Sequence, residues 1–156
     1  MDLATIEQLR QLKYRYLRTL DLKLWDDFAD TLTADVTADY GANLSFAGRE
    51  AVVTFMTNSL GPGIITVHHC HHPEISVDAD TATGSWYLDD KVIITEHRVL
   101  LTGAAFYEDA YRRCDDGAWR ISKTGYVRSY EAMQSLDDTP SWQLTANRWG
   151  SPTGLT

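Results

Sequence analysis

The sequence has few cysteines, few basic residues and no long apolar segment. Cys70 and Cys114 are its two cysteines and form no Cys-x-x-Cys pair, which excludes a disulfide scaffold. Acidic residues outnumber basic ones by 22 to 14, which argues against a nucleic-acid partner because phosphate-backbone binding needs clustered cations. No apolar run approaches the length of about 18 residues that spans a bilayer, and no signal-peptide pattern is present. We therefore expect a cytoplasmic protein with no membrane partner.

Motifs for nucleotide binding and for serine hydrolysis are also absent, so neither activity has support. What the sequence does contain is many aromatic residues: 8 Tyr, 5 Trp and 4 Phe among 156 residues. So many rings in one small domain are typical of a dense core or of an apolar pocket with polar tips.

Helical patterns come first along the chain and strand patterns follow. Apolar residues recur at steps of three and four over 3–24, with charged residues such as Lys13 between them, which predicts a long helix with a solvated face. A short helical piece, a hairpin over 35–47 and a helix over 48–60 come next. From residue 64 the period changes to two, which predicts strands over 64–77, 82–95, 99–114 and 119–130. This order predicts an α+β fold with the long helix packed on a curved sheet.

Asp21 stands out within the first helical pattern. A helix that continues through it would carry its carboxylate on the buried apolar stripe, four residues after Leu17. A buried carboxylate needs a partner, because an unpaired buried charge is costly. Alternatively, Asp21 caps the short second helix, a position where Asp is preferred, and spacing alone favours this interpretation.

Residues 68–72 read His-His-Cys-His-His at the start of a predicted strand. Alternate residues of a strand face opposite sides, so the run offers only a partial zinc ligand set, and we expect no metal. One inward histidine acting as a general base, with its tautomer fixed by Asp21, is the simpler hypothesis. The alternative is a set of polar residues on the surface.

One face of the predicted strand over 99–114 carries a polar row of Tyr107, Asp109 and Tyr111. This row is too polar for a closed core, and it fits a wet cavity, a solvent face or a subunit interface.

The last predicted strand carries two cations of opposite parity. Lys123 shares a face with Trp119 and Ile121, whereas Arg128 lies on the other face. Either cation could hold an oxyanion, and either could be a simple surface charge.

The order of these features resembles the SnoaL-like branch of the nuclear-transport-factor-2-like superfamily. The similar segments are the Tyr-x-x-x-x-Asp spacing from Tyr16 to Asp21, the Gly-Arg-Glu-Ala sequence at 48–51, and the stretches 66–82 and 106–121. The resemblance implies a cone-shaped α+β barrel, with a curved and mostly antiparallel sheet wrapped around the long N-terminal helix. This domain would cover residues 1–133, and residues 134–156 would form an irregular tail.

Members that look similar include scytalone dehydratase, bile acid 7α-dehydratase and lindane dehydrochlorinase, which use an Asp–His pair for elimination. The resemblance implies that Asp21 and His68 form this pair, with His69 as the alternative base, and that Tyr16 assists at a substrate oxygen. The residues that it implies for substrate binding are Trp25, Tyr40, Phe55, Tyr87 and Tyr107, together with Lys123 or Arg128 as the cation.

The expected function is therefore a cofactor-independent, dehydratase-like lyase for a small hydrophobic molecule of polycyclic, steroid-like or polyketide-like character. The same residues could instead isomerise or cyclise a ketone, or activate water for hydrolysis, because all of these begin with a positioned proton transfer. A hypothesis of another class is a module that binds a hydrophobic ligand without turnover. The open sheet face of such cones also implies a homo-oligomer, a dimer or a trimer.

Overall fold

The computed structural model describes residues 3–41 and 44–150, which form an α+β fold as predicted. The helices are α1 (Leu3–Leu22), α2 (Trp25–Asp30) and α3 (Arg49–Ser59). The strands are β1 (Leu32–Asp39), β2 (Ser45–Ala47), β3 (Ile64–Asp78), β4 (Thr81–Ile94), β5 (Val99–Arg113) and β6 (Trp119–Ser135). A short 3-10 helix, η1 (Leu136–Asp138), follows β6. Among the described helices, none has the length and apolar character needed to cross a membrane.

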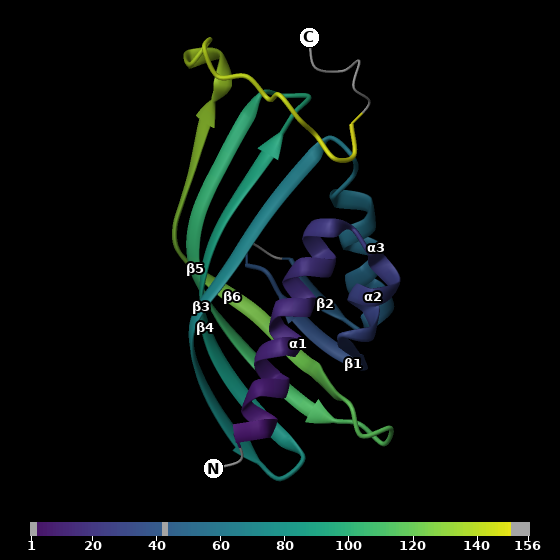
Figure 1. Cartoon of the computed structure of the whole chain (residues 1–156). Coiled ribbons are helices and arrows are strands. Elements are labelled where there is room, and N and C mark those ends of the chain that lie inside the picture. Colours follow the sequence, from purple (N-terminus) through teal and green to yellow (C-terminus); the bar gives the residue numbers. More distant parts are fainter. Residues whose placement is uncertain (1–2, 42–43, 151–156) are drawn as a thin grey trace.

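All of the strands belong to one sheet in the order β2-β1-β6-β5-β4-β3. Neighbouring strands are antiparallel except β1 and β6, which are parallel. Figure 1 shows the long strands curving together, with α1 lying across their concave face and α2 and α3 beside it. The expectation of a curved, mostly antiparallel sheet packed on the first helix is confirmed.

The main core lies between α1 and the concave face of the sheet. The buried side chains of α1 include Leu9, Leu17 and Leu20, which recur at the predicted helical spacing. Lys13, which we expected on the solvated face, is completely buried, so that expectation is wrong. The reason is geometric: position 13 lies four residues after Leu9 and four before Leu17, and therefore on the apolar stripe.

A bulge in β6 overturns the predicted parity of both Lys123 and Arg128 relative to Ile121. Ala110 of β5 pairs with Lys123, but its neighbour Tyr111 pairs with Ile121, so β6 has one more residue than β5 at this point. Ile121 is consequently buried on the concave side, whereas Lys123 is exposed on the opposite face. A two-residue period cannot reveal such an insertion.

The segment after β6 lies against the rest of the molecule. Leu136 of η1 is buried, and residues 139–150 then run from the end of β6 across the ends of the strands toward the helices (Figure 1). Asn147 Nδ2 donates to the carbonyl of Pro62 at 3.3 Å, and Lys23 Nζ lies 4.8 Å from the centre of a Trp149 ring. These contacts join the segment to the turn before β3 and to the end of α1.

Candidate functional site

The carboxylate of Asp21 and the ring of His68 form a hydrogen-bonded pair. Asp21 lies in the last turn of α1, and His68 Nδ1 lies 2.7 Å from its Oδ1. The backbone N–H of His68 donates to Asp21 Oδ2 at 2.9 Å, and the hydroxyl of Thr66 donates to Oδ1 at 2.8 Å. The helix-cap interpretation is therefore wrong, since α2 starts after Leu24 and has no side-chain cap.

These contacts fix the orientation and the tautomer of His68. An ionised carboxylate can only accept hydrogen bonds, so Nδ1 carries the hydrogen that is shared with Asp21. In this tautomer Nε2 is the ring nitrogen that can accept a proton. The side chain of His68 is 13% exposed and that of Asp21 is 22% exposed, so the pair is shielded but reachable. This is the arrangement that a general base requires.

Two buried tyrosines, Tyr16 of α1 and Tyr40 directly after β1, form a second hydrogen-bonded pair. The hydroxyls of Tyr16 and Tyr40 lie 2.8 Å apart, and Tyr16 has no exposed surface. Burial raises the pKa of both phenols well above the ordinary value, so both are neutral at physiological pH and can donate a hydrogen bond. The ring of Tyr40 also lies 5.8 Å from that of Tyr126.

Arg128 lies on the concave face and forms an ion pair with the buried Asp90. Its Nη1 donates to Asp90 Oδ1 and its Nη2 donates to Asp90 Oδ2 at 3.0 Å, so the ion pair is bidentate. Asp90 is the cross-strand partner of His68, which brings this pair into the same row of the sheet as the histidine. Burial by itself lowers the pKa of Arg128. The hydrogen bonds to Asp90 and the charge of that carboxylate raise it by more, so the pKa lies above its ordinary value.

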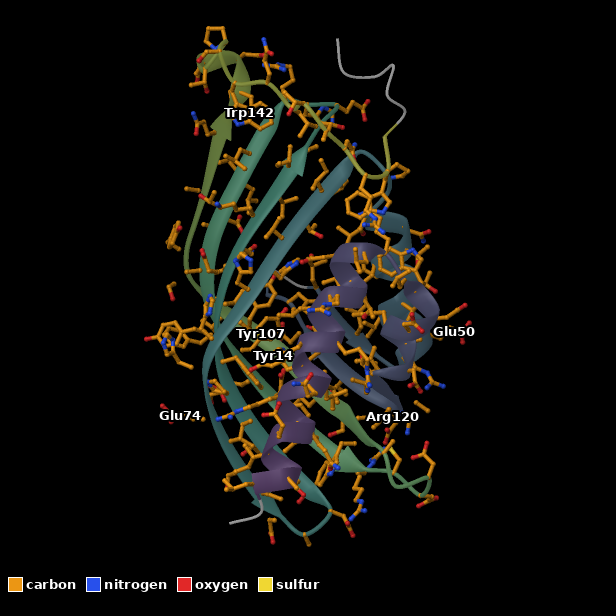
Figure 2. All side chains as sticks on the ribbon, viewed as in Figure 1. Tyr14, Glu50, Glu74, Tyr107, Arg120 and Trp142 are labelled. Atoms are coloured by element: carbon orange, nitrogen blue, oxygen red, sulfur yellow. The ribbon has the colours of Figure 1, made fainter. Side chains whose placement is uncertain are left out.

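The row of Tyr107, Asp109 and Tyr111 is buried and belongs to a closed polar network, so the expectation that it is too polar for a closed core is wrong. Lys13 Nζ lies 2.8 Å from Asp109 Oδ2, and neither side chain is exposed. Asp109 also accepts hydrogen bonds from Tyr111 at 2.9 Å and from Thr124 at 2.7 Å. Tyr107 lies between the sheet and α1 (Figure 2), with Lys13 Nζ 3.4 Å from its ring centre. Burial lowers the pKa of Lys13, and Asp109 opposes this shift.

Some of the residues implied for substrate binding lie on the helical side of the sheet, and others do not. Trp25 and Phe55 are partly buried against the main core. Tyr87 is half exposed on the convex face, 4.4 Å from the ring of Phe106, and Lys123 is exposed on the same face. The structure does not bring Tyr87 or Lys123 to Asp21 and His68. Of the two candidate bases, His68 contacts Asp21, whereas His69 is exposed and lies 6.1 Å from the ring of His71.

Two separate hollows are lined by residues of the candidate site. One, of about 630 Å³, lies where α1 meets the edge strand β3, and its walls include Asp21, His68 and His69. Another, of about 690 Å³, follows β6 beyond the end of β1, and its walls include Tyr40 and Arg128. Tyr16 lies five residues before Asp21 on α1 and hydrogen-bonds to Tyr40, a wall of the second hollow.

Three further residues belong to the candidate site: Asp90 and Tyr126, which we did not single out from the sequence, and Lys13, which we expected on the solvated face. Asp90 had a usable signal, because it has the same parity as Trp86 and Leu88, which are both buried. A carboxylate that continues a buried row must have a partner. Tyr126 had no such signal, because the bulge of β6 comes before it.

Solved structures with the same fold support this description. A hexachlorocyclohexane dehydrochlorinase (LinA type 2) superposes with a TM-score of 0.77 at 22% identity, covering 85% of this chain and 90% of that one. LinA type 3 from Novosphingobium barchaimii LL02 has a TM-score of 0.76 at 21% identity, over 85% and 92% of the two chains. A protein from Novosphingobium aromaticivorans, provisionally described as a scytalone dehydratase, has a TM-score of 0.76 at 18% identity, over 84% and 88%.

At these identities the likeness shows a shared fold and a distant similarity to dehydrochlorinase and dehydratase lyases. The sequence comparison goes further, because the SnoaL-like domain family matches residues 1–125, most of the chain. That range includes α1, with Asp21, and β3, with His68. The chain therefore belongs to the SnoaL-like domain family, as its resemblance in sequence predicted.

Proposed function

We propose that this protein is a cofactor-independent lyase that removes a proton and a leaving group from neighbouring carbons of a small hydrophobic substrate. The observation that carries the proposal is the contact of 2.7 Å between His68 Nδ1 and Asp21 Oδ1, with Nε2 left as the base. The distant similarity in fold to a dehydrochlorinase and to a protein described as a dehydratase favours elimination over other proton transfers.

In this mechanism, His68 Nε2 takes a proton from a carbon next to an electron-withdrawing group. The electron pair of that C–H bond forms the new double bond, and the leaving group departs from the adjacent carbon with its own bonding pair. The carboxylate of Asp21 stabilises the imidazolium that forms. When the leaving group is hydroxide, His68 can return to it the proton that it took from carbon, so that the group departs as water.

The phenols of Tyr16 and Tyr40 supply hydrogen-bond donation in this proposal. Both stay protonated because burial holds their pKa values well above the ordinary one. A neutral phenol can donate to a departing hydroxyl or to an enolate oxygen, where negative charge develops. Arg128 offers further N–H groups from the other side of the concave face.

The experiment is a screen for elimination with ring-based β-hydroxyketones and chlorinated cyclohexanes, followed by kinetics on the best substrate. We expect His68→Ala and Asp21→Asn each to lower kcat/KM by about 10²–10⁴-fold, the usual contribution of a general base and of the group that orients it. His97→Ala is the matched control, because this histidine is exposed in the turn between β4 and β5 and is not among the walls of the hollow at Asp21 and His68, and the rate of this variant should not change. Turnover that survives His68→Ala would show that another group removes the proton.

A readout without substrate accompanies the kinetics. ¹⁵N NMR of the histidine rings should find His68 held in the Nδ1–H tautomer, and Asp21→Asn should release this preference. If no compound is turned over and ligand affinity does not depend on His68, the binding-module hypothesis replaces the lyase.

A further inference from the structure

The cation on the concave face is neutralised by its own surroundings. Both Nη atoms of Arg128 donate to the buried carboxylate of Asp90. Arg128 Nε lies 3.2 Å from Glu131 Oε2, so a second carboxylate faces the same guanidinium. Asp90 is 2% exposed and Arg128 is 24% exposed, which places the carboxylate behind the guanidinium and leaves part of the guanidinium accessible.

Gly103 provides the space in which this ion pair fits. It is buried on β5, and it is the cross-strand partner of both Asp90 and Glu131. A methyl group at Gly103 would overlap Arg128 Nη1 and would lie 3.1 Å from Asp90 Oδ1. Its φ angle is not in the left-handed region, so the backbone does not require a glycine here. The missing side chain therefore serves the position of the guanidinium.

Carboxylates outnumber cations around the hollow that follows β6. Asp39, Glu131 and Arg128 are among its walls, Glu108 and Lys123 border it from the convex face, and Asp90 adds another negative charge behind the arginine. On the side of Arg128, the apolar part of the wall includes the rings of Tyr40 and Tyr126, whereas Phe106 borders the hollow from the convex face. This hollow is suited to ring compounds that accept hydrogen bonds but carry no negative charge.

We propose that Asp90 and Gly103 are positioning residues that hold Arg128 as a charge-compensated hydrogen-bond donor, so that the site takes uncharged ring substrates and rejects anionic ones. This inference deepens the proposed lyase function and rests on it, because it names the substrate class. It does not depend on which residue removes the proton.

The test compares two fluorescent probes that share a ring system and differ by one charge: N-phenyl-1-naphthylamine, which is neutral, and 8-anilinonaphthalene-1-sulfonate, which is anionic. We expect the native protein to bind the neutral probe more tightly. Asp90→Asn should strengthen binding of the anionic probe by about tenfold, since it frees the charge of Arg128, while binding of the neutral probe changes less than about twofold. Gly103→Ala should act in the same direction.

Asp89→Asn is the matched control, because Asp89 is the neighbour of Asp90 but is exposed and paired with His69 on the opposite face. It makes the same change in net charge and should alter neither affinity. Adding Arg128→Met to Asp90→Asn should abolish the gain for the anionic probe. Equal effects of Asp89→Asn and Asp90→Asn, or a gain that survives without Arg128, would overturn the inference.

A double-mutant cycle on unfolding tests the positioning without any ligand. Asp90→Asn and Arg128→Met should each lower the free energy of unfolding. The free energy of unfolding of the double variant should not fall below that of the less stable single variant. Additive losses would contradict the proposed pairing. Loss of elimination in His68→Ala with intact probe selectivity would support both proposals, whereas intact selectivity without any turnover would remove only the lyase.

Discussion

Lys13 and Asp109 form an ion pair that has no contact with solvent, between the rings of Tyr16 and Tyr107. Removing one member of such a pair leaves an uncompensated buried charge, which costs about 3–5 kcal/mol. We therefore expect Lys13→Met to lower the free energy of unfolding by about that amount. The double variant Lys13→Met/Asp109→Leu should lose less, because it leaves no buried charge.

Denaturant unfolding followed by tryptophan fluorescence measures these differences. Lys91→Met is the matched control, since Lys91 is exposed on β4 and should be nearly neutral to replacement. A Lys13→Met variant as stable as the Lys91→Met variant would show that the pair contributes nothing to the folded state.

Four buried phenols predict instability in alkali. Burial raises the pKa values of Tyr16, Tyr40, Tyr107 and Tyr111 well above the ordinary value of 10.0. Above pH 10 the unfolded chain has lost these protons while the folded chain keeps them, so stability falls as pH rises. Lys13 acts in the opposite sense, because folding lowers its pKa, but it is one group against four.

Tyrosinate absorbance at alkaline pH, recorded together with far-UV circular dichroism, checks this prediction. We expect the buried phenols to ionise in the same cooperative step in which the helical signal is lost, at a pH above that of exposed tyrosines. Smooth ionisation of every tyrosine near pH 10 with the fold intact would contradict it.

At the scale of the elements, periodicity was sufficient for the order and type of the main helices and strands. The apolar stripe of α1 and the alternation in β3, β4 and β5 are strong patterns, because each element buries one face. The predicted strand ends at residue 130, whereas β6 continues to Ser135. Its last residues, from Glu131 to Ser135, are all exposed and show no alternating burial, so periodicity cannot detect them. The bulge at Lys123 was not predictable from the sequence of β6 alone.

The site could be predicted less well than the fold, because its contacts join distant elements. Spacing along α1 favoured a helix cap for Asp21, and only the family resemblance pointed to His68 as its partner. The pairing of Asp90 with Arg128 depends on the register of three strands and on the space at Gly103. None of these is a local property of the sequence.

Gly48 begins α3 in a conformation that other residues avoid. It is the N-cap residue, with φ 90° and ψ 141°, and a methyl group there would meet nothing closer than 3.9 Å. We expect Gly48→Ala to cost about 1–3 kcal/mol through backbone strain alone. Gly61→Ala is the matched control, because its φ is not left-handed and no atom lies within 4 Å, so its unfolding midpoint should stay close to that of the native chain. Equal midpoints for both variants would argue against strain at Gly48.

At the scale of the whole molecule, the contacts of η1 predict a folded domain that extends beyond residue 133. Leu136 is buried, its N–H donates to the Arg98 carbonyl at 2.7 Å, and Arg98 pairs with Asp137. A chain ending after Asp138 keeps these contacts and should lose about 1 kcal/mol or less. A chain ending after Met133 loses them, and we expect a cost of about 2–3 kcal/mol from the buried leucine.

Chemical unfolding of the two truncated chains distinguishes these boundaries. Should both chains be equally stable, η1 would be dispensable and the domain would end at residue 133, as the sequence analysis predicted. A large loss in the chain ending after Asp138 would assign stability to the Asn147 and Trp149 contacts instead.

The parallel pairing of β1 with β6 has a consequence for how the protein is made. Leu32 pairs with Ile121 and Asp39 pairs with Gly125. β1 is the first strand of the domain to be synthesised, and this pairing cannot form until β6, the last strand, has been made. Until then β1 has only the three-residue β2 beside it, and the apolar stripe of α1 lacks part of its cover. Long-range pairing of this kind slows folding and prolongs the exposure of apolar surface. Synthesis of this small domain therefore includes an interval in which most of its strands have been made but the sheet is still open. During that interval the exposed apolar surface is accessible to molecular chaperones.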